Sequence, residues 1–173
     1  RYGNPATRYR GTVRLHSSDT SAELPGELTF TEADRGAHCF EKVTLRTTGS
    51  HTISVTDGKL RAAGNPVRVA RARPEQLLLW GDLHGHTLYS DGRGTVDQYY
   101  DFARDFAGLD FCAVSDHAFE IMDAIWKHTK AVTNRRNEPG RFVTFHAYEW
   151  SGNTNVGGDH NVYFLDADPP LFR

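Results

Sequence analysis

The chain has 173 residues, of which 38% are hydrophobic and 24% are charged, a composition typical of a globular protein. Its 20 lysines and arginines and 22 aspartates and glutamates give a formal net charge of -2, so no basic surface for nucleic acid or an anionic membrane is expected. No apolar run approaches the ~20 residues that span a bilayer, and the N-terminus lacks the apolar core of a signal peptide, which favours the cytoplasm.

Residues 1–73 alternate short runs of β-favouring residues with turn signals, which predicts an all-β sandwich. The expected strands are 11–16, 28–31, 38–46 and 51–56, and the sequence Thr-Asp-Gly-Lys at 56–59 is the expected hairpin turn. The segments YGNP (2–5), ELPGELTFTEADRGAHCFEKVTL (23–45) and GSHTISVTDG (49–58) resemble bacterial immunoglobulin-like repeats. We therefore expect an immunoglobulin-like β-sandwich that is incomplete at its N-terminus.

Residues 74–173 change to a succession of strand, loop and helix, the order of βα units with a parallel sheet. Thr95 is expected to cap a helix that begins at Val96 and that Gly108 ends. The segment 77–80 is apolar throughout, as a strand buried on both faces of a parallel sheet should be. The other expected elements are the strands 109–114, 141–148 and 161–165 and a helix at 121–135.

Histidines and carboxylates follow these strands, at the ends where α/β folds place their sites. His84 and His86 are two residues apart, so in an extended segment both side chains leave on the same face and can converge on one metal ion. Imidazole together with carboxylate suits zinc, manganese or iron better than calcium or magnesium. The accompanying candidates are Asp82, Asp91, Asp116, His117, Glu149 and His160. Each alone has an ordinary structural interpretation, but their order at successive strand ends predicts a metal site.

Two of these segments, GDLHGHTLYSDG (81–92) and FCAVSDHA (111–118), resemble the first two motifs of the PHP superfamily, named for polymerase and histidinol phosphatase. The later YEWSG (148–152) and GGDHNVYF (157–164) resemble the continuation in an uncharacterised bacterial branch of that superfamily. The resemblance implies that residues 74–173 form the first half of a distorted (β/α)7 barrel, incomplete at its C-terminus. A second chain segment would then complete the barrel.

The resemblance also implies two or three divalent metal ions, zinc, manganese or iron, at the strand ends. His84, His86 and Glu149 would hold the first ion. Glu149 would bridge to a second ion that is bound by His160.

A third ion would be bound by Asp91 and His117. Asp82 and Asp116 would orient the imidazoles through hydrogen bonds, which fixes the tautomer and raises the basicity of a ligand. Glu149 and Asp116 are the candidate catalytic carboxylates.

The function predicted from these features is that of a metal-dependent hydrolase. A phosphoesterase is expected by the resemblance, with a small-molecule ester as substrate and a metal-activated water as nucleophile. Two alternatives stay open at this stage. The same metals could hydrolyse an amide or a carboxylic ester, or the protein could be a non-catalytic binding module in which the barrel is vestigial.

Overall fold

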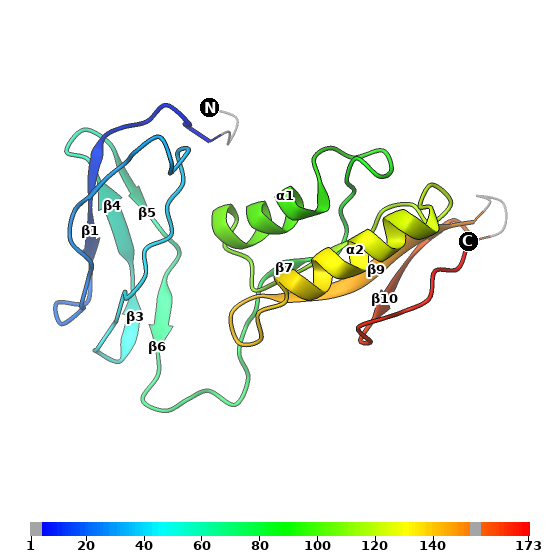
Figure 1. Cartoon of the computed structure of the whole chain (residues 1–173). Coiled ribbons are helices and arrows are strands. Elements are labelled where there is room, and N and C mark those ends of the chain that lie inside the picture. Colours follow the sequence, from blue (N-terminus) through cyan, green and yellow to red (C-terminus); the bar gives the residue numbers. More distant parts are fainter. Residues whose placement is uncertain (1–4, 153–156) are drawn as a thin grey trace. The chain divides into compact units, whose positions relative to one another are not determined.

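Two units make up the chain, Arg1–Leu77 and Leu78–Arg173, so the division falls slightly beyond the expected boundary at residue 73 (Figure 1). The computed structural model describes residues 5–152 and 157–173, so of the YGNP segment only Pro5 is described. Among the described residues, no helix combines the length and the apolar character needed to cross a membrane.

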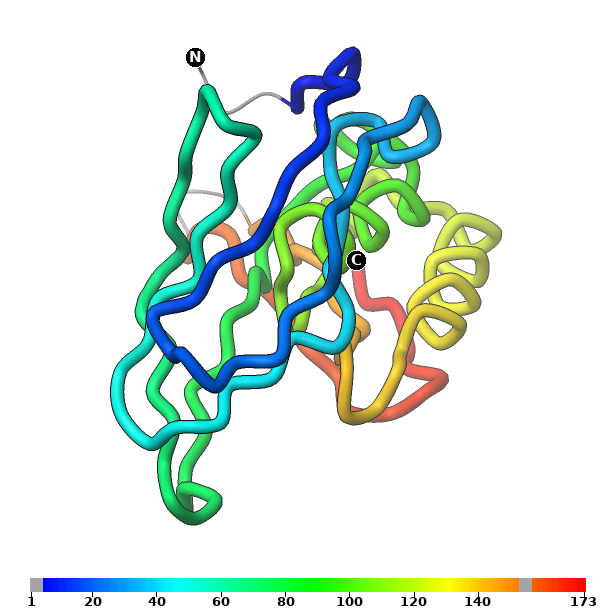
Figure 2. The backbone as a smooth tube through the Cα atoms, turned by 90° about the vertical axis from the view of Figure 1, so that its left-hand side faces the viewer, coloured from blue at the N-terminus to red at the C-terminus, as the bar shows by residue number. Residues whose placement is uncertain are grey.

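The first unit is built from antiparallel strands. Its described strands are β1 (Thr12–Ser17), β2 (Leu28–Thr29), β3 (Gly49–His51), β4 (Ile53–Thr56), β5 (Arg61–Ala63) and β6 (Val67–Val69). They form one sheet in the order β2-β1-β4-β5 and a second sheet of β3 and β6, and the tube in Figure 2 follows these up-and-down passes. The predicted turn at 56–59 joins β4 to β5, with Gly58 at φ +88°.

One expected strand of this unit is not formed. The strand predicted at 38–46 is wrong: Thr44 alone pairs with Glu23, in an isolated bridge, and Lys42 has φ +62°, which interrupts an extended strand. The all-β character is as predicted. An immunoglobulin-like sandwich stays a prediction, because Val13, at 8% exposed, is the one buried hydrophobic side chain among the described residues of this unit.

A buried carboxylate connects the loop after β1 to the segment before β3. The Asp19 carboxylate accepts hydrogen bonds from the backbone N–H groups of Ser21 (3.0 Å), Arg46 (2.6 Å) and Thr47 (2.9 Å) and from the Thr47 hydroxyl (2.8 Å). Asp19 is 4% exposed. The hydrogen bond from the Thr47 backbone, followed by the others, holds the pKa of Asp19 far below its ordinary value.

The second unit contains β7 (Gly81–Asp82), α1 (Val96–Asp101), a π-helical turn η1 (Phe102–Phe106), β8 (Phe111–Val114), α2 (Asp123–Arg136), β9 (Val143–Ser151) and β10 (Asp159–Phe164). The sheet order is β10-β9-β8-β7. The strands β7, β8 and β9 are parallel, as predicted. The prediction of a parallel sheet is wrong for β10, which pairs antiparallel with β9. The described strands form no closed barrel, and the first half of a barrel stays a prediction.

The strand predicted at 77–80 is also wrong. Leu77 to Trp80 are between 54% and 79% exposed, and the ladder begins only at Gly81. The reason lies in the neighbouring strand: β8 begins at Phe111, so ladder pairing is limited to Gly81 and Asp82, and of the segment 77–80 the Trp80 carbonyl accepts from the Asp110 N–H at 2.7 Å.

The helices cover one face of this sheet (Figure 1). Thr95 caps α1 as predicted, in a capping box with Gln98, and Gly108 follows the helical segment with φ +65°. The buried side chains on this face form two clusters: Val96, Tyr100, Ala103, Cys112, Val114, Val132 and Phe142, and Ala118, Ile121, Trp126 and Tyr148. Because side chains alternate along a strand, Glu149 points to the face opposite Tyr148 and the helices.

We predict that the first unit is sensitive to acid through Asp19. Its depressed pKa means that the carboxylate stabilises the folded unit above the unfolded pKa of about 4, and that this stabilisation is lost as the pH falls through the folded pKa. The protection factors of the amides of β1 and β4 in the whole chain, which are corrected for the pH dependence of intrinsic exchange, should therefore fall between pH 5 and pH 2. Asp19→Ala should exchange fast already at pH 7, and an identical pH profile in that variant would contradict the assignment.

Candidate metal centre

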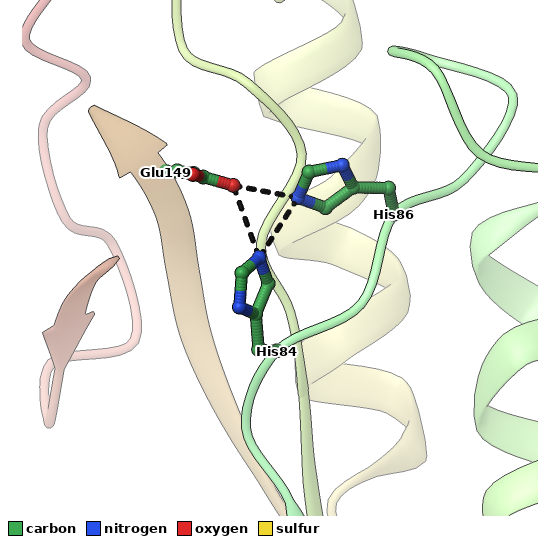
Figure 3. Close-up of side chains that lie close together, drawn as sticks. All are labelled: His84, His86 and Glu149. Atoms are coloured by element: carbon green, nitrogen blue, oxygen red, sulfur yellow. Dashed lines mark hydrogen bonds and ion pairs between the residues drawn. The ribbon is translucent and has the colours of Figure 1, made fainter. Parts of the chain in front are cut away.

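Two imidazoles and one carboxylate converge at the carboxyl ends of the parallel strands. His84 and His86 lie in the loop after β7, and Glu149 lies near the end of β9. Their Nε2 atoms are 3.1 Å and 2.8 Å from Glu149 Oε2, and 3.2 Å from each other. Figure 3 shows both rings directed toward the carboxylate. The spacing of two residues thus places both rings on one side of the loop.

The position of Glu149 is set by the backbone of the neighbouring strand. Its N–H donates to the carbonyl of Asp116 (3.0 Å), and its carbonyl accepts from the N–H of Ala118 (2.8 Å). His117 and Glu149 are paired in parallel between these bonds. Glu149 is 6% exposed, and a carboxylate buried to this extent requires polar or cationic partners. The two imidazoles supply them here.

Gly85 allows the histidine loop to lie close to the unit's core. Its carbonyl accepts from the Ser115 N–H at 2.8 Å, and its own N–H donates to the Ser115 hydroxyl at 3.2 Å. A Cβ atom at Gly85 would lie 1.9 Å from the Tyr99 hydroxyl. Any side chain between the two histidines would therefore displace either Tyr99 or the loop that presents both rings.

His86 lies between two carboxylates. Its Nδ1 is 2.5 Å from Asp91 Oδ1, while its Nε2 faces Glu149. Burial alone would lower the pKa of His86, but the hydrogen bonds with Asp91 and Glu149 outweigh it and raise the pKa. A carboxylate on the far nitrogen of a ligating imidazole is the usual device that fixes its tautomer and orientation. Asp91 fills this role for His86.

His117 completes a second group of potential ligands. Its Nε2 is 3.9 Å from Asp91 Oδ1, and its Nδ1 is 2.8 Å from the Ser151 hydroxyl. Among the described residues, the groups able to hold an ion are His84 with His86 and Glu149, and His86 with Asp91 and His117. The two groups share His86, so Asp91 is engaged with that ring and is not independent of the first group.

Asp116 and Asp82 do not contact an imidazole, contrary to expectation. Asp116 is 2% exposed and accepts from the Thr87 N–H (2.6 Å), the Thr87 hydroxyl (2.7 Å) and the Ser90 hydroxyl (2.6 Å). Asp82 accepts from the backbone N–H of His84 at 3.1 Å. Both carboxylates hold the backbone of the ligand loop. Because Asp116 is buried and its oxygens are occupied, the structure does not support a catalytic role for it.

His160 lies outside both groups. It pairs with Trp150 across the hairpin, whereas Asn161 pairs with Glu149. Side chains of directly paired residues lie on the same face of a sheet, so His160 points to the face opposite Glu149. Its ring is 6.1 Å from the Trp150 ring. The expected sharing of an ion between Glu149 and His160 is not met by this register.

The donor atoms of the first group fit a transition-metal ion. Ligand atoms at 2.0–2.1 Å from a tetrahedral ion are about 3.3 Å apart, close to the separations of 2.8, 3.1 and 3.2 Å found here. Two imidazoles and a carboxylate also form a donor set that zinc, manganese and iron accept. The residues present therefore fit such an ion.

Four hydroxyl residues of the site were not predicted from the sequence: Thr87, Ser90, Ser115 and Ser151. Each lies within two residues of a candidate site residue in the chain, which was the one available signal. Short hydroxyl side chains are common in loops, so their proximity to the histidines does not single them out.

Comparison with known proteins gives partial matches. Residues 112–170 match a family described as protein of unknown function (DUF3604). An uncharacterized protein of Chlamydia pneumoniae is 28% identical over 87 residues, which cover 49% of this chain and 14% of that protein. A solved two-domain protein of Bacteroides vulgatus, containing a predicted PHP-like metal-dependent phosphoesterase, is 20% identical, with a TM-score of 0.38 over 56% of this chain and 32% of that one. The chain thus spans a minor part of both proteins.

Replacing Asp116 should weaken metal binding without removing a ligand. In Asp116→Asn one accepting oxygen becomes a donor, so one or two of the three hydrogen bonds from Thr87 and Ser90 are lost, at a cost of about 1–3 kcal/mol each. We expect lower stability in urea and weaker binding of Mn²⁺ or Zn²⁺ by calorimetry. Ser90→Ala, which removes one hydrogen bond, should have a smaller effect of the same sign. Unchanged metal affinity in Asp116→Asn would show that the loop does not depend on this carboxylate.

Proposed function

We propose that the second unit belongs to a metal-dependent hydrolase and that it acts as a phosphoesterase on a small-molecule ester. The observation that carries the proposal is the convergence of His84, His86 and Glu149 on one point. Catalytic metal sites commonly use three protein ligands and leave a further position for water or substrate. The His84 side chain is 53% exposed, so this group is accessible from solvent.

The residues around the group have separable roles in this proposal. A bound divalent ion would supply Lewis acidity and a water molecule of lowered pKa. His84, His86 and Glu149 would hold it, and Asp91 would keep the proton on Nδ1 of His86. The preorganised site would then stabilise the negative charge that develops on the ester during hydrolysis.

We propose one ion in a complete ligand set and a second ion in a partial one. One complete ligand set is formed by Nε2 of His84, Nε2 of His86 and the Glu149 carboxylate. A second ion would use His117 Nε2 and Asp91, whose side chain is 66% exposed. The preference for phosphate over carbonyl substrates rests on the resemblance of segments 81–92 and 111–118 to PHP motifs.

Metal binding is the first test. The whole chain should bind Mn²⁺ or Zn²⁺ in calorimetric titration, and His84→Ala or Glu149→Gln should weaken binding at least tenfold, because each removes one of three ligands. His16→Ala, an exposed histidine of β1 in the other unit, is the matched control and should bind as the parent does. Failure of the metal-reconstituted chain to retain either metal would favour the non-catalytic binding module.

Measurement of turnover on different substrates tests which bond the protein hydrolyses. Metal-loaded protein should hydrolyse p-nitrophenyl phosphate or its bis-ester, and His84→Ala should lose that activity. Hydrolysis of p-nitrophenyl acetate or an anilide, with no action on phosphate esters, would replace the phosphoesterase by the amide or carboxylic ester hydrolase. Undiminished turnover in His84→Ala would exclude this site as the source.

A further inference from the structure

A row of four rings leads from the metal-ligand group to an exposed phenylalanine. The ring centroids of His84 and His86 are 5.1 Å apart, those of His86 and His117 are 4.6 Å apart, and those of His117 and Phe119 are 5.3 Å apart. Phe119 is the one member without a donor atom. It is 61% exposed, although its ring lies against His117 at an angle of 34°.

The turn that carries Phe119 is fixed relative to Glu149. The N–H of Ala118 donates to the Glu149 carbonyl at 2.8 Å, and the N–H of Glu120 donates to the His117 carbonyl at 3.0 Å. Ala118 is 1% exposed and Ile121 is 2% exposed, so both anchor the turn in the core. Phe119 therefore projects from a firmly held turn at a set distance from the candidate ligands.

A hollow of about 320 Å³ adjoins the Phe119 ring. It is lined by Phe119, Glu120, Ile121, Met122, Asp123 and Arg173. Its volume lies at the lower end of the roughly 300–1,000 Å³ typical of small-molecule sites. The hollow is thus large enough for one ring.

The charges of this hollow do not favour a second anionic group. The Arg173 guanidinium donates to Asp123 Oδ1 and, at 2.9 Å, to the Ile121 carbonyl, so its charge is already paired. The Glu120 carboxylate would repel an anion. The apolar surface of the hollow comes from the exposed side chains of Phe119 and Met122, against which an uncharged ring can pack.

We propose that Phe119 binds the planar aromatic group of the substrate while the charged ester group lies at the histidines. This inference rests on the proposed function, since it places the ester at His84, His86 and Glu149. It narrows the substrate to esters with an aryl or heteroaromatic group near the reacting centre. Ring-on-ring contact with Phe119 should favour such a ligand by about three- to tenfold over one with a methyl group.

Binding of two phosphonates to the Mn²⁺-loaded whole chain tests this without requiring turnover. Phenylphosphonate should bind about three- to tenfold more tightly than methylphosphonate in calorimetric titration. Phe119→Ala should abolish the preference, and Phe119→Tyr, which keeps the ring, should retain it. The matched control is Phe102→Ala, a phenylalanine that is 54% exposed and begins η1. It should leave the preference intact.

The outcomes bear differently on the two proposals, and binding of neither phosphonate would count against both. Equal binding of the two phosphonates, binding of neither, or a preference that survives in Phe119→Ala would overturn the aromatic site. Hydrolysis of phosphate esters without a preference for aryl groups would leave the proposed function standing and remove this inference alone. A Phe119-dependent preference in a protein that hydrolyses no phosphate ester would remove the phosphoesterase and retain the aromatic site.

Discussion

Three electron-rich atoms within 3.2 Å of one another form the constraint on which the second unit depends. The Nε2 atoms of His84 and His86 and one oxygen of Glu149 cannot remain so close unless protons or a metal ion lie between them. The Glu149 carboxylate is also buried, and an uncompensated buried charge is costly. The site therefore requires hydrogen-bond protons or a metal ion at one point, and its donor set is one that divalent transition metals accept.

The rest of the unit holds these atoms in place through backbone contacts. Parallel pairing of β8 and β9 aligns Glu149 with His117, and Ser115 binds the backbone of Gly85 between the two histidines. Asp116 binds Thr87 and thereby the loop that carries Asp91. Precise sites generally need such supporting hydrogen bonds around the ligands. In this chain the support comes mostly from residues that contact no imidazole.

Local sequence pattern predicted the parts of this arrangement that depend on neighbouring residues. The helix cap at Thr95 and the shared direction of His84 and His86 follow from local geometry, and the structure has both. The face of His160 depends on the register of β10, where a shift of one residue reverses every side chain, and local pattern does not specify it. The engagement of Asp91 with His86 depends on loop closure at Gly92, where a Cβ would lie 2.1 Å from the His86 carbonyl oxygen. The exposure of Leu77 to Trp80 likewise depends on where β7 pairs with β8, which local pattern does not specify.

The most direct test of the central claim is crystallographic. Crystals of the whole chain grown with Mn²⁺ or Zn²⁺ should show an anomalous difference peak, at the absorption edge of that metal, about 2.0–2.2 Å from the Nε2 atoms of His84 and His86 and from an oxygen of Glu149. A peak at other side chains, or a crystal saturated with metal in which these three residues bind none, would contradict the account.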